Sequence, residues 1–560
     1  MSDLSIFIVG AAGEGIQTIG DIVAHALLKS GIAVFTSKEY ESRIRGGHNS
    51  YRLRVSGPNA PRHDADVLLA LNPSAFEHYR SSARPGATLI GELSDDEEGL
   101  PLHFQAMAKE TFGSTIFANT LAAGALSAVV GLPPDVVQSV VEKRLSKLSD
   151  EVIQQNVRAI RMGFEAASKK LEPESGTALS ATREDHVFAS VHEIIPLAAA
   201  AAGCRFMAAY PMSPSTGIMT AFARDPELGV FVEQAEDEIA AVNMSLAASA
   251  AGARAMTSTS GGGFALMTEG LSLAGMTETP LVLVLAQRPG PATGLPTRTA
   301  QEDLSFALYG GHGEFPRAIL APADPQDAAR LTYRAFDLAD RYQIPVILLT
   351  DQLLADAHFS LDALTLPSEP PPSGLADPSA FETYERYRWT SDGVSPRLAL
   401  GQSEHLVCID SDEHTEAGHI TEDLVETRPA MVEKRLEKLR RLQQEMASPG
   451  CYRIEDAVTV LLSWGSSRGA VHEAVDRCRD RGLRVGAMHF TELWPLPEMK
   501  PSEGVSYWTV EGNATGQFAR LLLAETAFPL TGRIERYDGL PIDAASIVAV
   551  LLGEEEEARP

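Results

Sequence analysis

Two strand-to-helix junctions in the middle of the chain are rich in hydroxyl groups. The first is the segment YPMSPST at residues 210–216, and the second is TSTSGGG at residues 257–263. Prolines fix the backbone of the first junction, and its hydroxyls can hydrogen-bond a carboxylate, although an ordinary turn can have the same composition. Glycines and hydroxyls at the second junction favour a cradle for an anion or a cofactor.

Charged residues also lie near the predicted junctions between strands, loops and helices. The segment EQAEDE at residues 233–238 opens an alanine-rich helix, where acids complement the helix dipole and need no further role. Arg288 and Arg298 flank the irregular loop GPATGLPT at residues 290–297. Two guanidinium groups on one loop suit recognition of a dicarboxylate.

The N-terminal region carries a glycine-rich turn and a cationic segment. The turn GAAGEGIQ at residues 10–17 follows a predicted strand, but Ala12 replaces a glycine of the dinucleotide fingerprint, so a ligand-free turn explains it equally well. The cationic segment RIRGGHNSYRLRVS at residues 43–56 suits a phosphate-bearing ligand such as coenzyme A. Alternatively, its last two arginines form the solvated face of a strand. The candidate coenzyme A ligands are Arg45, Gly46, Gly47, His48 and Asn49.

Strands and helices alternate along most of the chain, which predicts an α/β fold with several doubly wound α/β domains. The expected divisions are a first module over residues 1–170, a linker over 171–185, a second module over 186–360, a connecting segment over 361–450 and a third module over 451–560. Within the connecting segment, the charged run at residues 431–446 is expected to form a surface helix.

Composition excludes several classes of protein. The 560 residues have a formal net charge of −28 and no basic stripe, which argues against nucleic acid as a partner. Four cysteines without a CxxC pair argue against a disulfide scaffold or an iron-sulfur centre in this chain. No segment has the pattern of a secretory signal or a membrane span, so we expect a cytoplasmic location.

Taken together, these motifs resemble the alpha chain of 2-oxoacid:ferredoxin oxidoreductases. The resemblance rests on YPMSPST, on VEQAEDEIAAVNMSLAASAAGARAMTSTSGGGFALMTEGL and on QRPGPATGLPTRTAQEDL. GAAGEGIQ and RGGHNS resemble the gamma module of the same family, here fused to the N-terminus. Glu14 and Gly262 depart from the family patterns, which have glycine or glutamine and proline at these positions.

The resemblance implies a thiamine diphosphate enzyme whose second module is the pyrimidine-binding domain and whose third is transketolase C-terminal-like. It gives Glu236 the role of the carboxyl that favours the imino tautomer of the aminopyrimidine. Ser213, Arg288 and Arg298 are the implied substrate ligands. The implied cofactor ligands are Tyr210, Pro211, Thr259, Ser260 and Gly261.

The sequence lacks a GDG motif followed by an asparagine pair, so the diphosphate and Mg²⁺ site is expected on a beta subunit, together with a [4Fe–4S] cluster. The implied reaction is the reversible, coenzyme A-dependent oxidative decarboxylation of a 2-oxoacid with ferredoxin reduction, in a dimer of alpha–beta pairs. The beta subunit should also dock ferredoxin, which is usually acidic like this chain. The arginine loop favours 2-oxoglutarate, with pyruvate and branched-chain oxoacids as alternatives. Other functions considered are a non-catalytic assembly subunit, a nicotinamide-dependent dehydrogenase and a transketolase-like enzyme.

Overall fold

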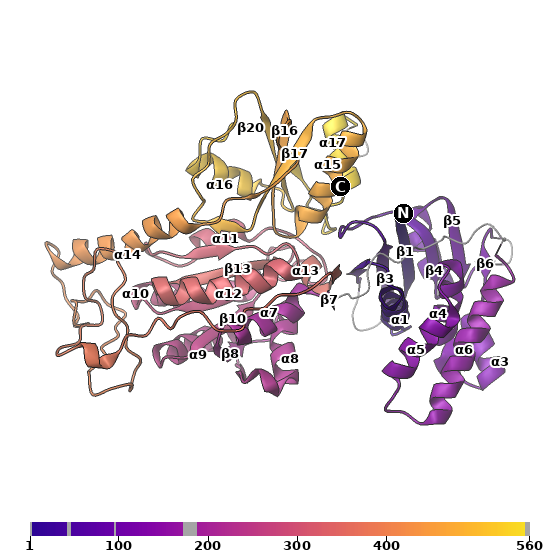
Figure 1. Cartoon of the computed structure of the whole chain (residues 1–560), viewed down its shortest axis with the longest axis horizontal. Coiled ribbons are helices and arrows are strands. Elements are labelled where there is room, and N and C mark those ends of the chain that lie inside the picture. The colour runs from indigo at the N-terminus through magenta and orange to yellow at the C-terminus, as the bar shows by residue number, and fades with distance from the viewer. Residues whose placement is uncertain (1–2, 42–45, 95–96, 172–186, 555–560) are drawn as a thin grey trace. The chain divides into compact units, whose positions relative to one another are not determined.

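A computed structural model describes residues 3–41, 46–94, 97–171 and 187–554 (Figure 1). The chain forms two compact units, of which the first comprises Met1–Ala189 and Asp356–Ala363. The second comprises Ser190–Ala355 and Leu364–Pro560. The α/β class expected from the sequence is confirmed. The linker predicted from the polar stretch before residue 186 lies almost entirely outside the described residues.

The first unit contains a mixed sheet in the order β6-β5-β4-β1-β3-β2-β14-β7. β1 pairs parallel with β4 and antiparallel with β3, and β3 pairs antiparallel with β2. The alternating pattern favoured a parallel sheet, but too few residues separate β2 from β3 for a crossover helix, so they form an antiparallel pair. The strands are β1 (Leu4–Ala12), β2 (Val34–Glu39), β3 (Gly46–Val55), β4 (Ala65–Ala70), β5 (Ala83–Gly91), β6 (Leu100–Pro101), β7 (Val187–Ala189) and β14 (His358–Leu361).

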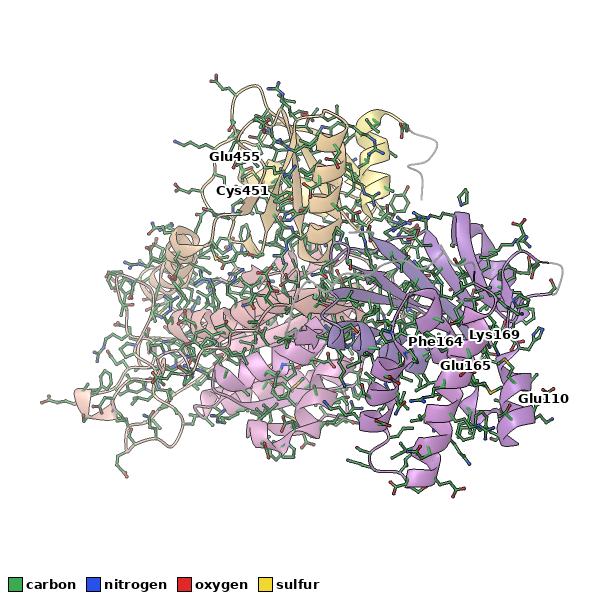
Figure 2. All side chains as sticks on the ribbon, turned by 45° about the vertical axis from the view of Figure 1, so that its right-hand side comes forward. Glu110, Phe164, Glu165, Lys169, Cys451 and Glu455 are labelled. Atoms are coloured by element: carbon green, nitrogen blue, oxygen red, sulfur yellow. The ribbon has the colours of Figure 1, made fainter. Side chains whose placement is uncertain are left out.

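Helices cover both faces of this sheet. One face packs against α1 and α4 in a large apolar core, and the other packs against α2 through Phe76. The uncharged stretch that contains α4 is a buried helix, as its interrupting polar residues predicted. Glu165 is exposed on α6, and Lys169 is exposed just after it (Figure 2). The helices are α1 (Ile16–Lys29), α2 (Pro73–Tyr79), α3 (Phe104–Phe112), α4 (Ala118–Val129), α5 (Pro134–Arg144) and α6 (Asp150–Ser168).

The second unit contains a seven-stranded sheet in the order β18-β12-β13-β11-β10-β8-β9. All its neighbouring strands pair parallel except β12 and β18. The apolar runs predicted as strands do form this sheet, and both faces are buried. The strands are β8 (Cys204–Ala209), β9 (Phe231–Gln234), β10 (Arg254–Thr259), β11 (Leu281–Gln287), β12 (Ala318–Leu320), β13 (Pro345–Asp351) and β18 (Glu492–Trp494).

A further five-stranded sheet in the second unit has the order β15-β17-β16-β19-β20 and is parallel apart from β15. Side chains from both sheets of this unit, including Leu285 and Trp464, share one apolar core. The strands are β15 (Gly450–Tyr452), β16 (Thr459–Trp464), β17 (Val485–Phe490), β19 (Ser506–Glu511) and β20 (Leu530–Glu535). Cys451 of β15 and Glu455 are labelled in Figure 2.

The helices of the second unit cover its two sheets and part of the connecting segment. They are α7 (Val191–Ala201), α8 (Thr216–Arg224), α9 (Glu238–Ala250), α10 (Gly261–Met276), α11 (Leu304–Tyr309), α12 (Pro325–Tyr342), α13 (Gln352–Asp356), α14 (Thr427–Glu445), α15 (Arg468–Asp480), α16 (Gln517–Glu525) and α17 (Ala544–Leu552). No helix in the described parts of the chain has the length and apolar character needed to cross a bilayer.

Helix α14 is not the purely solvated helix that its charges predicted. Lys434 and Lys438 are fully buried and both pair with Glu278, Lys434 at 2.6 Å. Burial opposes ionisation of Glu278, but the two ammonium groups hold its pKa below the usual value. Glu278 follows α10, so these ion pairs fix the connecting segment against the seven-stranded sheet layer.

Helices α4 and α6 approach each other closely through two glycines. A Cβ atom on Gly124 would overlap the carbonyl oxygen of Ile160, and one on Gly163 would overlap that of Leu121. Only glycine permits this backbone contact, since the obstructing atoms belong to the opposite helix.

We therefore expect Gly163→Ala to destabilise the first unit by about 1–3 kcal/mol, because the added methyl group must force the helices apart. Urea unfolding of the variant measures this difference. Gln154→Ala, on the exposed face of α6, is the matched control and should change stability by less than about 0.5 kcal/mol. Equal stabilities of the two variants would show that the helices separate without cost.

Candidate active site at the carboxyl ends of parallel strands

The two predicted junctions lie at the point where the strand order of the seven-stranded sheet reverses. The chain adds β9 on one side of β8 and then β10, followed by β11, on the other side. In such sheets, ligands bind in the crevice outside the carboxyl ends of the strands at the reversal point. Residues 210–216 follow β8 and residues 260–263 follow β10, so both hydroxyl-rich junctions lie at this edge.

The buried acid at this edge is Glu238, the first residue of α9. Asp237 caps this helix by accepting a hydrogen bond from the Ala240 amide at 2.7 Å. The Glu238 side chain is buried, and a Cβ atom placed on Gly263 would lie 2.5 Å from Glu238 Oε1 and would overlap Thr259 Oγ1. The absence of a side chain at Gly263 therefore lets the carboxyl of Glu238 lie against the first turn of α10.

Glu236 lies in the turn between β9 and α9, with an exposed side chain. The resemblance gives Glu236 the catalytic role at an interface with a beta subunit, which this chain by itself does not form, and that role stays a prediction. The sequence did not single out Glu238, because both acids lie in one short acidic run. The available signal was Asp237, whose residue type suits a helix N-cap and so makes Glu238 the first helical position.

Several hydroxyl groups near the end of β10 are buried without a hydrogen-bond partner among the described residues. They belong to Thr257, Ser258 and Ser260, each at most 1% exposed. Buried polar atoms are normally paired, so unpaired hydroxyls at a strand end favour a ligand that completes them. Thr259 is also buried and its Oγ1 lies 3.8 Å from Met212 Sδ, which links the two junctions. Gly261 begins α10 directly after Ser260.

Ser213 and Arg288, two of the candidate substrate ligands, lie next to each other. Arg288 Nη1 donates a hydrogen bond to the backbone oxygen of Ser213 at 2.7 Å. The arginine is only 9% exposed, and burial lowers the pKa of its guanidinium while the charge of Asp303 opposes this effect. A buried guanidinium held by one carbonyl keeps further donors for a ligand carboxylate.

Arg298, Tyr210 and Pro211 are less buried than Arg288. Arg298 packs beside Gly539, since a Cβ on that glycine would lie 3.1 Å from Arg298 Cβ. Tyr210 is 41% exposed and Pro211 is half-buried. Ser215 Oγ donates to the Met212 carbonyl at 2.8 Å, which fixes the turn that presents Ser213.

His192, which sequence analysis did not single out, lies beneath this turn. It is 3% exposed, and its Nε2 lies 3.0 Å from Thr350 Oγ1. Burial lowers the pKa of His192 to about 4. An isolated histidine at the second position of a helix gives no sequence signal, because only the fold brings Thr350 to it.

The coenzyme A assignment concerns the start of β3 in the first unit. Gly46 and Gly47 are exposed with positive φ angles of 65° and 71°. His48 is half-buried and stacks on His78 with ring centroids 4.3 Å apart. Asn49 is buried and accepts a hydrogen bond from the Glu41 amide at 2.9 Å. Arg45 lies outside the described residues.

Two other features of the first unit differ from the sequence-based alternatives. Arg52 and Arg54 are buried, not on a solvated face, and Arg52 pairs with Glu39 at 2.7 Å. Glu14, one of the departures from the family pattern, accepts hydrogen bonds from the Ala11 amide at 2.8 Å and from an asparagine side chain. This carboxylate occupies a backbone donor of the glycine-rich turn, so the turn is less suited to an anion than its glycines suggested.

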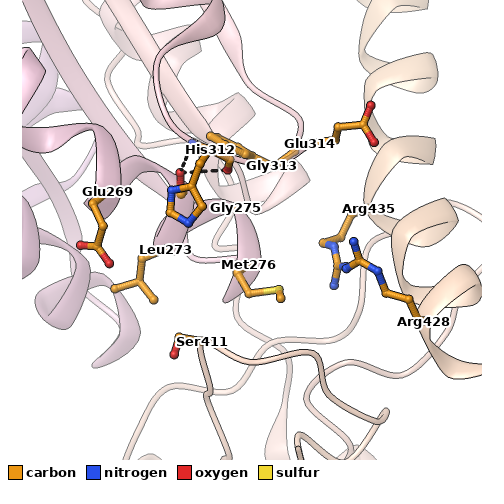
Figure 3. Close-up of a pocket in the computed structure, with 12 residues that line it drawn as sticks. Glu269, Leu273, Gly275, Met276, His312, Gly313, Glu314, Ser411, Arg428 and Arg435 are labelled. Carbon is orange, nitrogen blue, oxygen red and sulfur yellow. Dashed lines mark hydrogen bonds between the residues drawn. The ribbon is translucent and has the colours of Figure 1, made fainter. Parts of the chain in front are cut away.

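A pocket of about 230 Å³ lies at the opposite end of α10. Its lining includes Met276, His312, Ser411, Arg428 and Arg435 (Figure 3). Both arginines pair with the same carboxylate of Glu413. This pocket is therefore separate from the junctions that carry the predicted chemistry.

The family models and the most similar proteins point to the same family. Residues 197–434 match the model described as pyruvate flavodoxin/ferredoxin oxidoreductase, thiamine diP-bdg, and residues 5–166 match the model of pyruvate ferredoxin/flavodoxin oxidoreductase. The alpha subunit of 2-oxoacid:ferredoxin oxidoreductase 2 from Aeropyrum pernix is 31% identical, over 100% of this chain and 99% of that protein. The KorA subunit of 2-oxoglutarate synthase from Methanothermobacter thermautotrophicus is 35% identical over 53% of this chain and 78% of that protein.

A solved structure has the same fold over the whole chain. It is the 2-oxoglutarate:ferredoxin oxidoreductase from Magnetococcus marinus with 2-oxoglutarate, coenzyme A and succinyl-CoA bound, with a TM-score of 0.90, 31% identity and 100% coverage of both chains. This chain belongs to the family of 2-oxoacid:ferredoxin oxidoreductase alpha subunits. The resemblance drawn from the sequence motifs is confirmed, and the chain is part of an oxidoreductase.

The burial of His192 predicts a stability change with pH. In the unfolded chain His192 has a pKa of about 6.5, whereas in the folded chain its pKa is about 4. Between these two pH values the unfolded state therefore binds more protons. The contribution of His192 to the free energy of unfolding is therefore fully present above a pH of about 6.5. It falls by up to about 3 kcal/mol as the pH drops from about 6.5 to about 4. Urea unfolding of His192→Asn at about pH 7 and about pH 5 should show a smaller loss than the wild type.

The matched control for this histidine is His312→Asn, because His312 is exposed. It should lose as much stability as the wild type when the pH falls. A His192→Asn loss equal to that of the control would show that His192 does not titrate in this window.

Proposed function

We propose that this chain is the alpha subunit of a thiamine diphosphate-dependent enzyme that oxidises 2-oxoglutarate to succinyl-CoA and CO₂ and reduces ferredoxin. The observation that carries the proposal is the convergence of three groups at one sheet edge. The carboxyl of Glu238 lies against the first turn of α10, unpaired hydroxyls surround the end of β10, and Arg288 is held at the backbone of Ser213. An acid, hydroxyls and a buried cation are the groups that this chemistry requires from the pyrimidine side of the site.

The residues present fit the aminopyrimidine half of thiamine diphosphate. The crevice offers a buried carboxyl at Glu238, the unpaired hydroxyl of Ser260 and the side-chain-free Gly261 and Gly263. When bound, the cofactor supplies the nucleophilic carbon and the electron sink of the reaction. Glu238 would hold a proton toward the ring nitrogen of the aminopyrimidine, and Ser260 would contribute a hydrogen bond beside it.

We assign substrate binding to Ser213, Arg288 and Arg298. Arg288 and Ser213 would hold the carboxylate beside the reacting carbonyl, and Arg298 is the candidate for a second carboxylate. The preference for 2-oxoglutarate is supported by the two arginines and by the names of the KorA relatives and of the Magnetococcus marinus enzyme. Pyruvate is the second candidate, because it needs only the first carboxylate site.

The remaining parts of the enzyme are assigned to other components. The sequence has no GDG motif with a following asparagine pair and no CxxC, which supports a beta subunit that binds Mg²⁺ and the diphosphate and carries the [4Fe–4S] cluster. The strongly acidic charge of this chain favours ferredoxin docking on that partner. Coenzyme A is assigned to the exposed Gly46 and Gly47 with His48 and Asn49, and a dimer of alpha–beta pairs is the proposed assembly.

Replacing Glu238 tests the proposed catalytic carboxyl. In the reconstituted alpha–beta complex, we expect Glu238→Gln to lower kcat by about 100-fold or more, because the amide cannot transfer the proton. Glu236→Gln is the matched control, two residues away and exposed, and should keep most of the turnover. Dye reduction with substrate and coenzyme A measures both variants.

If Glu236→Gln is inactive and Glu238→Gln is active, the catalytic carboxyl is Glu236, as the family resemblance implies. Full activity of both variants would favour the non-catalytic assembly subunit. Size-exclusion chromatography of each complex separates loss of chemistry from loss of assembly.

Substrate specificity is tested in the same complex. We expect reduction of a viologen dye with 2-oxoglutarate and coenzyme A to exceed that with pyruvate, because only the first substrate engages both arginines. Arg298→Gln should weaken the preference by raising the KM for 2-oxoglutarate and leaving that for pyruvate unchanged. A wild-type complex that turns over pyruvate alone would contradict the two-arginine argument.

A further inference from the structure

Three side chains of the first unit lie close together near the start of β3 and take no part in the proposed chemistry at Glu238. Among the described residues, one group of at least three His, Cys, Asp or Glu side chains brings a ligand atom from each within 4.8 Å of the others. Its members are Glu41, just after β2, His48 of β3 and His78 of α2. Two neighbouring strands and a helix of the same unit therefore supply one side chain each.

Glu41 and His48 already have the spacing of two ligands of one ion. Glu41 Oε2 accepts a hydrogen bond from the His48 backbone amide at 2.6 Å and lies 3.2 Å from His48 Nδ1. Two atoms bound to one Zn²⁺ at about 2.0–2.1 Å in tetrahedral geometry lie about 3.3 Å apart. The hydrogen bond from the His48 amide also lowers the pKa of Glu41, against the effect of burial, which favours the ionised carboxylate that binds metals.

The other ring nitrogen of His48 has the kind of partner that a metal-bound imidazole needs. His48 Nε2 lies 3.0 Å from Ser74 Oγ, and the Tyr79 hydroxyl donates to the His48 carbonyl oxygen at 3.1 Å. A ligating histidine usually donates a hydrogen bond through its second ring nitrogen, which fixes the tautomer and the orientation of the ring. When Nε2 donates to Ser74, the lone pair of the ring is on Nδ1, the nitrogen that faces Glu41.

His78 completes the group from the side of α2. Its ring stacks on that of His48, with centroids 4.3 Å apart and planes within 2° of parallel. Two protonated imidazoles would repel each other at this distance, whereas neutral imidazoles, the form that binds metals, can lie side by side. Because His78 is exposed, a small rotation of its side chain brings its nitrogen to the spacing of bound ligands.

We propose that Glu41, His48 and His78 form a binding site for a divalent transition-metal ion of the zinc class, with His48 bound through Nδ1. Two imidazoles and one carboxylate favour Zn²⁺ over Ca²⁺ or Mg²⁺, which prefer oxygen ligands. Glu41 and His78 are exposed, so the remaining coordination position is open to water or to an anionic ligand. The inference does not rest on the proposed function, in which His48 is a candidate coenzyme A ligand.

Zinc binding to the full chain, without a beta subunit and without coenzyme A, tests this site. Competition with a chromophoric chelator of micromolar affinity should show one tightly bound Zn²⁺ per wild-type chain. Glu41→Gln keeps an oxygen acceptor for the His48 amide and should weaken Zn²⁺ binding by about 100-fold, as should His78→Asn, because each variant loses one ligand. Co²⁺ in place of Zn²⁺ should give a visible absorption with the wild type that both variants lose.

His103→Asn is the matched control, because His103 is an exposed histidine of the same unit whose Nδ1 also lies 3.0 Å from a carboxylate oxygen, that of Glu92. This variant should bind Zn²⁺ as the wild type does. A wild-type chain that loses all Zn²⁺ to the chelator overturns the inference, as do equal affinities of the wild type, Glu41→Gln and His78→Asn. If circular dichroism shows that one of these two variants is unfolded, the affinity of the other decides.

Discussion

The burial of one carboxyl against the start of a helix is the constraint on which the proposed site depends. Glu238 reaches α10 because Gly263 has no side chain and because α9 begins at this residue. Both helices follow parallel strands, whose carboxyl ends share one edge of the sheet. The residue at which α9 begins therefore determines which acid is buried in this chain and which is exposed.

The α/β class and the positions of the candidate junctions could be predicted from the sequence. Apolar runs ending in glycines, prolines and hydroxyls indicated strand ends, and the motif order indicated the family. Ser213 and Arg288 were predicted together, and the structure joins them by a hydrogen bond. The burial of Glu238 and the exposure of Glu236 could not be predicted in the same way, because they depend on the residue at which α9 begins.

Buried charges were the second feature that the sequence did not reveal. Lys434 lies 156 residues from its partner Glu278, and local composition indicates only that such a lysine is charged. Arg52 and Glu39 pair across neighbouring strands, which becomes evident once the antiparallel register of β2 and β3 is known. The surface or core location of a charge depends on long-range pairing, and a motif search detects the residue without its partner.

The central claim concerns the contact between Glu238 and the aminopyrimidine ring. A structure of the assembled alpha–beta complex with thiamine diphosphate bound measures that contact directly. Our account predicts an oxygen of Glu238 at a hydrogen-bonding distance of about 2.6–3.2 Å from a ring nitrogen. A ring nitrogen that is bound by Glu236, or a cofactor remote from both acids, would contradict it.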